Sequence, residues 1–253
     1  MTRLHGRTAI VTGAARGLGA GIAQALAEDG AAVVLADVLP QVNDTAAALA
    51  SAGHRTLAVH LDVTSEENWH LALTTAVQSF GEVSILVNNA GITINKDFES
   101  VSIDEFRKIL DVNLLGAFRG MQAVLPSMKR AGGGAIINVA STTTDQILSI
   151  APCYGASKSA LANLTKSAAL HCAEQGYGIR VNSVHPGTHA TPMVMGDGMA
   201  TEHPAARAII EAIPMKRMGQ PLELGRVVAF LASQDASYMT GAEVFSDGGA
   251  VIT

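Results

Sequence analysis

The sequence predicts an α/β fold: a doubly wound parallel sheet with helices on both faces. Short β-branched, apolar runs alternate with amphipathic stretches along the chain. These runs lack apolar–polar alternation, which favours strands buried on both faces. Of the 253 residues, 48% are hydrophobic and 15% are charged, so a sizeable buried core is expected. No low-complexity linker or fixed-period repeat interrupts the pattern, and we expect a single domain over residues 1–253.

The first half of the chain alternates strands and helices at βαβ spacing. Thr64 and Glu67 have capping-box spacing, so they predict the start of a helix that runs to about Phe80. Right-handed crossovers would make the connected strands parallel. The other expected elements are strands Thr8–Val11, Ala32–Asp37, Leu57–Leu61 and Ile85–Asn88, and helices Leu18–Asp29 and Val42–Ala52.

The second half continues this pattern, apart from one irregular stretch. Between Pro186 and Pro221 the chain holds Gly, Pro and five of its nine methionines. A long irregular segment is typical of a functional lid, expected at about residues 188–220; the alternative is a surface excursion with core-filling methionines. The regular elements expected here are one or two helices in Asp104–Lys129, helices Tyr154–Glu174 and Leu222–Ala232, and strands Ala135–Val139, Ile179–Val184 and Glu243–Phe245.

Charge and composition exclude several classes of partner. The formal net charge is −5 and there is no Lys/Arg run, which disfavours binding to nucleic acid or to anionic membranes. The amino-terminal sequence has no signal-peptide core and no apolar run approaches the roughly 18 residues of a membrane span. A cytoplasmic protein is expected. Cys153 and Cys172 suggest no disulfide framework, and no His/Cys/Asp cluster has metal-ligand spacing.

A glycine-rich turn follows the first expected strand. Thr12-Gly13-Ala-Ala-Arg16-Gly17-Leu18-Gly19 has G-x3-G-x-G spacing between a strand and a helix. Glycines let the backbone approach a pyrophosphate, and the helix amino end offers free N–H groups and a positive dipole end. Alone this signal is weak. Asp37, at the end of the second strand, strengthens it, because a carboxylate there can bind the adenosine ribose of a dinucleotide.

Asp37 also bears on the choice between NAD and NADP. A fixed carboxylate would face the 2′-phosphate of NADP, and two like charges in contact cost on the order of a few kcal/mol. Arg16 points the other way, because a base beside the turn could bind that phosphate. We favour NAD, since Asp37 would clash directly whereas Arg16 can turn into solvent. The alternative reading of Asp37 is a helix N-cap.

Tyr154 and Lys158 lie four residues apart, on one face of an expected helix. A phenol normally titrates near 10, and an ammonium at about 4 Å would lower that pKa by roughly three units. Tyr154 could then act as an acid/base near neutral pH. Ser141 follows the strand Ala135–Val139, at the strand end where ligands bind in open sheets, and could hydrogen-bond the substrate oxygen.

These motifs resemble those of the short-chain dehydrogenase/reductase family, classical subgroup, over nearly the whole chain. The resemblance implies a Rossmann-like fold and an oxidoreductase that interconverts a secondary alcohol and a ketone. The matching motifs are Thr12-Gly13-x3-Gly17-x-Gly19, Asp62-Val63, Asn88-Asn89-Ala90-Gly91, Asn113, Ser141, Tyr154-x3-Lys158, and Pro186-Gly187 followed by Thr191.

The resemblance also implies roles for the matched residues. Tyr154 would be the general acid/base, and Lys158 would lower its pKa and hold the nicotinamide ribose. Ser141 would position the substrate oxygen, and Asn113 would anchor a water that relays protons from Lys158. His185 is interpreted as a packed histidine, because a proton path exists without it. The implied cofactor-binding residues are Gly13, Arg16, Gly17, Leu18, Gly19, Asp37, Asp62, Val63, Asn89, Gly91, Tyr154, Lys158, Pro186, Gly187, Thr188 and Thr191.

The substrate pocket is expected between residues 142–153, the chain after Gly91, and the methionine-rich segment after Thr191. Apolar walls favour an apolar alcohol or ketone, with cyclic, terpenoid and steroid-like compounds included, and adaptable methionines favour broad specificity. Cys153 is interpreted as a small buried side chain rather than a wall residue. Besides Ser141 and Tyr154, the expected wall residues are Ile147, Leu148, Ile150, Met193, Met195 and Met199.

Two alternatives remain open. An NADPH-dependent 3-oxoacyl-thioester (acyl-carrier-protein) reductase has similar motifs, but it needs a basic patch for an acidic carrier. Lys129 and Arg130 could contribute to that patch, whereas residues 171–178 contain Glu174 and no Lys or Arg, and Asp37 disfavours NADPH. An inert nucleotide-binding or scaffold protein is disfavoured because the set of four catalytic residues is complete. The family resemblance further implies a homotetramer or homodimer, with helices Asn113–Lys129 and Tyr154–Glu174 as interface surfaces.

Overall fold

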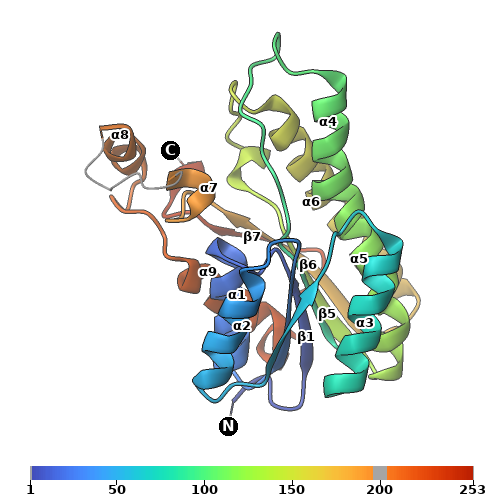
Figure 1. Cartoon of the computed structure of the whole chain (residues 1–253). Helices are drawn as coiled ribbons and strands as arrows, with labels where there is room; N and C mark the ends of the chain where they lie inside the picture. Colours follow the sequence, from blue (N-terminus) through green and yellow to red (C-terminus); the bar gives the residue numbers. More distant parts are fainter. Residues whose placement is uncertain (1, 196–203, 253) are drawn as a thin grey trace.

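A computed structural model describes residues 2–195 and 204–252 of the chain (Figure 1). Its strands within these ranges form one parallel sheet in the order β3-β2-β1-β4-β5-β6-β7, which confirms the predicted α/β class. The strand order reverses beside β1, where β4 lies on the other side of it from β2. The strands are β1 (Thr8–Thr12), β2 (Ala32–Asp37), β3 (Thr56–His60), β4 (Ile85–Asn88), β5 (Gly134–Val139), β6 (Ile179–Pro186) and β7 (Glu243–Ser246).

The described helices cover both faces of this sheet. In Figure 1, α1, α2 and α9 lie on one side and α3, α5 and α6 on the other. The bounds are α1 (Gly17–Glu28), α2 (Val42–Ser51), α3 (Glu66–Phe80), α4 (Ile103–Leu110), α5 (Gly116–Arg130), α6 (Pro152–Glu174), α7 (Pro192–Met195), α8 (Pro204–Ala212) and α9 (Pro221–Ala232). Short turns of helix are the π-helix η1 (Asp111–Leu115) and the 3-10 helices η2 (Thr142–Thr144), η3 (Gln234–Ala236) and η4 (Ala250–Ile252).

Alternate residues of the strands point into two separate hydrophobic cores, one on each face of the sheet. Val11 and Leu35 pack in one core against Ile22 of α1 and residues of α9. Their neighbours Ile10 and Val34 point to the opposite face, into a core with α3, α5 and α6. Because side chains alternate along a strand, a run of consecutive apolar residues is what a sheet covered on both faces requires.

Local capping signals decide where several helices begin. Ser102 and Glu105 form a complete capping box at α4, and Pro221 starts α9. The capping box predicted at Thr64 is wrong by one residue: Ser65 is the N-cap of α3 and accepts from the Asn68 N–H at 3.2 Å. Thr64 lies instead in the turn before the cap, where its N–H and its hydroxyl both donate to the Asp62 carboxylate.

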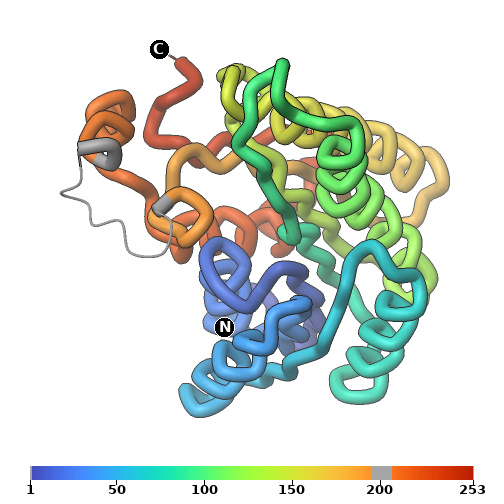
Figure 2. Tube along the Cα trace, turned by 45° about the horizontal axis from the view of Figure 1, so that its top comes forward, coloured from blue at the N-terminus to red at the C-terminus, as the bar shows by residue number. Residues whose placement is uncertain are grey.

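The carboxyl ends of the strands face one end of the molecule. In Figure 2, where the top of the molecule is turned toward the viewer, the connection from β4 to α4, the segments carrying α7 and α8, and the carboxyl-terminal end of the chain lie around that end. The loops that leave β1, β2, β4, β5 and β6 therefore determine what this end of the molecule can bind.

Among the described helices, none is both long and apolar enough to cross a lipid bilayer.

Candidate active site

The turn between β1 and α1 is shaped by its glycines. Gly13 and Gly17 have φ values of +64° and +59°, which side chains with a Cβ rarely adopt. A Cβ on Gly19 would collide with the carbonyl oxygen of Gly13 and lie 2.6 Å from the Asn89 amide nitrogen. The conformation of the turn and its close packing against Asn89 therefore require glycine at these positions, and its approach to a dinucleotide stays a prediction.

Asn89 holds this turn from the neighbouring strand β4. Its amide nitrogen donates to the carbonyl oxygens of Thr12 (2.9 Å) and Gly13 (3.0 Å). The Thr12 hydroxyl in turn accepts from the backbone N–H groups of Asn89 and Ala90, both at 3.0 Å. The amide nitrogen of Asn89, expected at the cofactor ribose, is thus committed to bracing the glycine turn.

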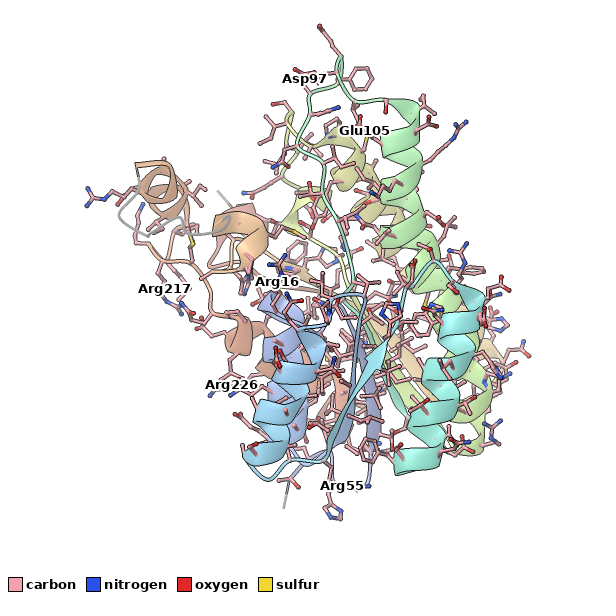
Figure 3. All side chains as sticks on the ribbon, viewed as in Figure 1. Arg16, Arg55, Asp97, Glu105, Arg217 and Arg226 are labelled. Atoms are coloured by element: carbon pink, nitrogen blue, oxygen red, sulfur yellow. The ribbon has the colours of Figure 1, made fainter. Side chains whose placement is uncertain are left out.

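Asp37 lies beside the turn at the end of β2 and is largely buried. Its two carboxylate oxygens accept from the backbone N–H groups of Ala15 (2.9 Å) and Leu39 (3.0 Å), which fixes the orientation of the carboxylate. Arg16 is exposed at the amino end of α1 (Figure 3), where no described side chain caps the helix. Free helical N–H groups, an open glycine turn and a fixed carboxylate fit the pyrophosphate and adenosine ribose of a dinucleotide.

Asp62 and Val63 follow β3 at the same edge of the sheet. The Asp62 carboxylate accepts from the Thr64 N–H (2.9 Å) and hydroxyl (2.8 Å), and these bonds lower the pKa of Asp62 below its ordinary value. The Val63 carbonyl oxygen accepts from the buried Trp69 indole at 3.1 Å. A Cβ on Gly116 would lie 2.6 Å from the Val63 side chain, so helix α5 packs tightly against this turn.

Tyr154 and Lys158 come from the first two turns of α6, which begins at Pro152, a favoured first residue. The buried Lys158 ammonium donates to the carbonyl oxygen of Val139 at 2.7 Å and lies 5.7 Å from the centroid of the Tyr154 ring. A Cβ on Gly91 would lie 3.4 Å from the Lys158 Nζ. The structure therefore brings Tyr154, Lys158 and the loop after β4 together, as expected.

The ionisation of this pair differs from the expectation. Burial raises the pKa of Tyr154 above its ordinary value, while a hydrogen bond with Ser141 lowers it. The lowering of the Tyr154 pKa expected from Lys158 is not found: burial is the largest influence on this phenol, and the Lys158 ammonium makes its hydrogen bond to the Val139 carbonyl. Burial also lowers the pKa of Lys158 to about 8. The low dielectric around the pair disfavours the charged form of both groups.

Asn113 lies in the π-helix between α4 and α5 and is fully buried. Its Oδ1 accepts from the Ile92 N–H (2.8 Å), and its Nδ2 donates to the Ile92 carbonyl and to the Ser157 hydroxyl, both at 3.0 Å. Ser157 donates to the carbonyl oxygen of Tyr154 at 2.7 Å. Our sequence reasoning missed Ser157, although its position three residues after Tyr154 places it on the same face of α6.

Ser141 ends β5 and opens the 3-10 turn Thr142–Thr144. Its hydroxyl accepts from the Thr143 N–H at 3.1 Å, and its carbonyl oxygen lies 3.2 Å from the Nδ1 of His185. His185 is completely buried, which confirms its interpretation as a packed histidine. The side chain of Ser141 is itself largely buried.

The chain after β6 closes on the glycine turn. A Cβ on Gly17 would lie 3.5 Å from the Thr191 side chain, and a Cβ on Gly187 would lie 2.8 Å from Asp247. Pro186 ends β6, and His189 forms a β-bridge with Gly219. The segment that contains Thr188 and Thr191, both expected to bind the cofactor, therefore lies over the amino end of α1.

The expected apolar wall residues are partly exposed. Ile147 is 80% exposed and Met193 of α7 is 54% exposed. Met195 ends α7, and Met199 lies outside the described residues. The amide of Gln146 donates to the carbonyl oxygen of Ala250, so the carboxyl-terminal turn meets the loop after Ser141, a neighbour that no sequence motif indicated.

Cys153 precedes Tyr154 and is buried, in agreement with its interpretation as a small packed side chain. Burial raises the pKa of its thiol above the ordinary value. Among the described residues, no cluster of His, Cys, Asp or Glu could hold a metal ion. Tyr154 remains partly exposed, so a ligand can reach it.

Known proteins resemble this chain over almost its full length. Residues 13–251 match the family described as enoyl-(acyl carrier protein) reductase. A 3-alpha-(or 20-beta)-hydroxysteroid dehydrogenase of Mycobacterium tuberculosis is 42% identical over 252 residues, covering 98% of this chain and 91% of the relative. A trans-4-hydroxycyclohexanecarboxylate dehydrogenase of Sinomonas cyclohexanicum is 40% identical over 254 residues, covering 98% and 93%. The crystal structure of a protein assigned as a short-chain alcohol dehydrogenase from Sinorhizobium meliloti superposes with a TM-score of 0.92 at 36% identity, covering 100% of this chain and 99% of the other.

Proposed function

The chain belongs to the short-chain dehydrogenase/reductase family, and on this premise we propose that it interconverts an apolar secondary alcohol and its ketone with NAD(H). The observation that carries the proposal is the cluster of Ser141, Tyr154, Lys158 and Asn113 at the carboxyl edge of the sheet, beside a glycine turn that fits a dinucleotide. The family makes NAD or NADP the cofactor, and the fixed Asp37 carboxylate favours NAD.

Each residue of the cluster has a different role in alcohol oxidation. Ser141 holds the substrate oxygen, and Tyr154 accepts the hydroxyl proton from it. Bound NAD supplies the acceptor for the hydride that leaves the carbinol carbon. Lys158 lies behind Tyr154 and would hold the nicotinamide ribose. Asn113 and Ser157 fix the first turn of α6 through the Tyr154 carbonyl, which preserves the orientation of the reacting groups.

A cyclic alcohol suits this site best. Ile147, Leu148 and Met193 expose apolar surface around the carboxyl edge, where the described parts of the segment after Thr188 and the carboxyl-terminal turn would add further walls. The two relatives near 40% identity are named for a hydroxysteroid and a hydroxycyclohexane substrate, both of which carry the alcohol on a ring. These names support a ring-bearing secondary alcohol as the substrate class.

A 3-oxoacyl-thioester reductase that uses NADPH is the second candidate, because the description of the matching family names an acyl carrier protein, the partner that such a reductase would also need. An acidic carrier protein needs free basic residues. Arg130 is paired with Glu82 at 2.8 Å, and the Lys129 ammonium lies 3.6 Å from the centroid of the Tyr177 ring. Because both basic side chains already have partners, and because Asp37 disfavours NADPH, we rank this function second.

An assembly of two or four subunits also follows from the family resemblance. Helices α5 and α6, expected as interface surfaces, expose Leu115 at the start of α5, Phe118 and Leu170. Apolar side chains exposed on neighbouring helices are typical of subunit interfaces. Sedimentation velocity at several protein concentrations measures the assembly directly.

Steady-state turnover tests the proposed function. The panel contains cyclic and linear secondary alcohols with NAD or NADP, and a 3-oxoacyl thioester with NADPH. We expect turnover of cyclic alcohols with NAD in preference to NADP. Reduction of the thioester with NADPH alone would move the second candidate to the front, and tight cofactor binding without turnover of any substrate would indicate an inert nucleotide-binding protein.

A further inference from the structure

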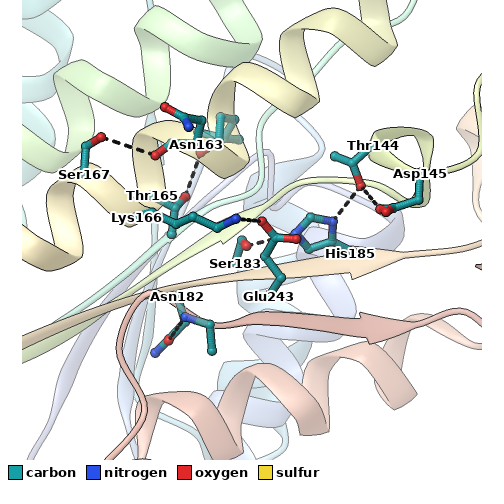
Figure 4. Close-up of polar contacts among 12 residues, drawn as sticks. Thr144, Asp145, Asn163, Thr165, Lys166, Ser167, Asn182, Ser183, His185 and Glu243 are labelled. Atoms are coloured by element: carbon teal, nitrogen blue, oxygen red, sulfur yellow. Dashed lines mark hydrogen bonds and ion pairs between the residues drawn. The ribbon is translucent and has the colours of Figure 1, made fainter.

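A buried polar chain lies directly behind Ser141 and has no part in the chemistry described above. Its centre is His185, the residue before Pro186 on β6 (Figure 4). The imidazole is completely buried and its ring centroid lies 4.7 Å from that of Phe245 on β7. A buried polar ring needs hydrogen-bond partners for both nitrogens, and the structure supplies them.

The two ring nitrogens have chemically different partners. The Nδ1 lies 3.2 Å from the carbonyl oxygen of Ser141 and 3.1 Å from the hydroxyl of Thr144. The Nε2 lies 2.9 Å from the hydroxyl of Ser183 on the same strand. The Ser141 carbonyl can only accept, and the Thr144 hydroxyl donates its proton to Asp145 at 2.6 Å, so we assign the ring proton to Nδ1. The Ser183 hydroxyl then donates to Nε2, which leaves the imidazole neutral with a defined tautomer.

The charged groups around His185 are consistent with this neutral form. Glu243 of β7 is paired with Lys166 of α6 at 2.6 Å, and Asp145 accepts from the Thr144 hydroxyl at 2.6 Å. Both carboxylates act to raise the pKa of His185 and Lys166 acts to lower it, but burial is the largest influence and leaves the pKa below its ordinary value. The ring therefore carries a single N–H, directed at Ser141.

The sheet itself explains why a side chain is needed here. Strands β5 and β6 are paired as far as the Ala140 N–H, which donates to the Val184 carbonyl at 2.8 Å. Pro186 is the next residue of β6 that could donate to this part of β5, and proline has no N–H. The backbone ladder between β5 and β6 therefore stops before Ser141. The Ser141 carbonyl accepts from the N–H of Thr144 (3.2 Å) and lies 2.9 Å from the Thr144 hydroxyl, both within its own turn, and His185 adds a donor that comes from the neighbouring strand β6.

We propose that His185 is a positioning residue for the reaction: through its Nδ1–H it fixes the Ser141 carbonyl and thereby the direction of the Ser141 hydroxyl toward the substrate oxygen. This inference rests on the proposed alcohol oxidation, because the hydroxyl of Ser141 is the group whose position matters. The effect is local, since the imidazole contacts the backbone carbonyl of Ser141 and the hydroxyl of Thr144 and not the cofactor turn.

Two amide variants separate the two nitrogens of the ring. The amide of His185→Asn can place an N–H donor near the position of Nδ1, whereas that of His185→Gln reaches toward Nε2. We expect kcat of the asparagine variant to stay within about threefold of wild type and kcat of the glutamine variant to fall about tenfold or more, as for the loss of one buried hydrogen bond. The KM for NAD should be unchanged in both, because the glycine turn is untouched.

Coupling to Ser141 is tested in a double-mutant cycle. In a Ser141→Ala background, His185→Gln should change the residual kcat by less than about twofold. An equal loss of kcat in the asparagine and glutamine variants, or a full further loss in the alanine background, would overturn the proposal. Circular dichroism of each variant identifies one that fails to fold, and the asparagine variant then provides the comparison.

A measurement without substrate keeps this proposal separate from the proposed function. In wild-type protein labelled with 15N-histidine, the His185 resonances, assigned by their loss in His185→Asn, report which nitrogen carries the proton. A protonated Nδ1 with an unprotonated Nε2 is expected at neutral pH. The opposite tautomer would refute the role of His185 even if the enzyme is active, and the expected tautomer in a chain without turnover would mean that the proposed reaction alone is wrong.

Discussion

Lys158 is a cation buried within the fold, and its surroundings oppose its charge. Burial brings its pKa to about 8, while an unfolded chain would keep a lysine pKa near the ordinary 10.5. Between these two values the unfolded state binds more protons than the folded state, so the free energy of unfolding rises with pH. Near neutral pH, the buried charge of Lys158 therefore lowers the free energy of unfolding of the wild-type chain.

The pH dependence of stability isolates this residue when wild type is compared with Lys158→Met. From pH 7 to about pH 9.5, the free energy of unfolding of wild type should rise by about 2 kcal/mol relative to the variant. Urea unfolding at both pH values gives the difference, and the shared titration of Tyr154 cancels in it. A difference that stays constant or falls with pH would mean that Lys158 is not a buried cation.

Asp37 controls the choice of cofactor at the scale of a single carboxylate. In Asp37→Ser a hydroxyl can still accept one of the two backbone N–H bonds, but the negative charge is gone. We expect the ratio of kcat/KM for NADP to that for NAD to rise at least about tenfold, because removing a like charge near the 2′-phosphate is worth more than about 1.4 kcal/mol. An unchanged ratio would assign the preference to another residue.

From the sequence we could predict which residues form the site, but not which hydrogen bonds they make. Tyr154, Lys158, Ser141 and Asn113 come together as expected, because motif positions determine which strand ends and which helix they occupy. The direction of the Tyr154 pKa shift could not be predicted, since it depends on how far the fold buries the phenol and on its hydrogen bond with Ser141. The bonds from Asn89 to the glycine turn likewise depend on the pairing of β1 with β4.

At the scale of elements, the connection from α4 to α5 shows how a local irregularity serves the site. The sequence predicted one or two helices here, and the structure has α4, a π-turn and α5 in direct succession. π-turns are rare and frequently found at functional sites. This one carries Asn113, whose three hydrogen bonds connect α5 to the loop after β4 and to α6.

Removing that clamp should affect stability and activity together. Asn113→Leu leaves the Ile92 N–H and carbonyl without their partner, so we expect the free energy of unfolding to fall by roughly 2–4 kcal/mol and kcat to fall at least about tenfold. Asn163→Leu, at an exposed position of the adjacent α6, is the matched control and should change stability by less than about 0.5 kcal/mol. Equal losses in the free energy of unfolding for the two variants would contradict the structural role of Asn113.

Two glycines at helix starts predict opposite outcomes for the same substitution. In Gly19→Ala the new Cβ meets the Gly13 carbonyl, so stability should fall by about 1–3 kcal/mol and NAD binding should weaken. In Gly155→Ala the nearest atom is 3.6 Å away, and alanine should stabilise helix α6 by about 0.5–1 kcal/mol. Thermal unfolding with and without NAD compares them. Similar effects on stability would show that the turn has room for a Cβ.

Element boundaries were predicted to within a few residues where caps and periodicity agree. The start of α3 was misplaced because Thr64 and Ser65 are both good N-caps, and the sequence does not distinguish between them; in the structure Ser65 is the cap and Thr64 bonds to Asp62. The contact between Gln146 and the carboxyl-terminal turn joins segments about a hundred residues apart, and no local pattern encodes such a contact.

At the scale of the whole molecule, the two cores and the candidate site occupy separate regions. Apolar residues fill both faces of the sheet, while the polar residues of the site gather at the carboxyl edge of the strands. This division lets the loops at one edge vary without disturbing the cores, and ligands in open α/β sheets bind at that edge. It explains why the fold resembles many proteins closely while the substrate must be argued from the loops.

The most direct test of the account compares wild type with Tyr154→Phe in the oxidation of cyclic secondary alcohols, followed by the absorbance of NADH. The phenylalanine ring keeps the packing of α6 and removes only the hydroxyl that exchanges the proton. Wild type should form NADH, and the variant should lose about 10²–10⁴-fold in kcat while retaining its affinity for NAD. A variant that oxidises the same alcohols at the wild-type rate would contradict the assignment of Tyr154 as the acid/base and the mechanism built on it.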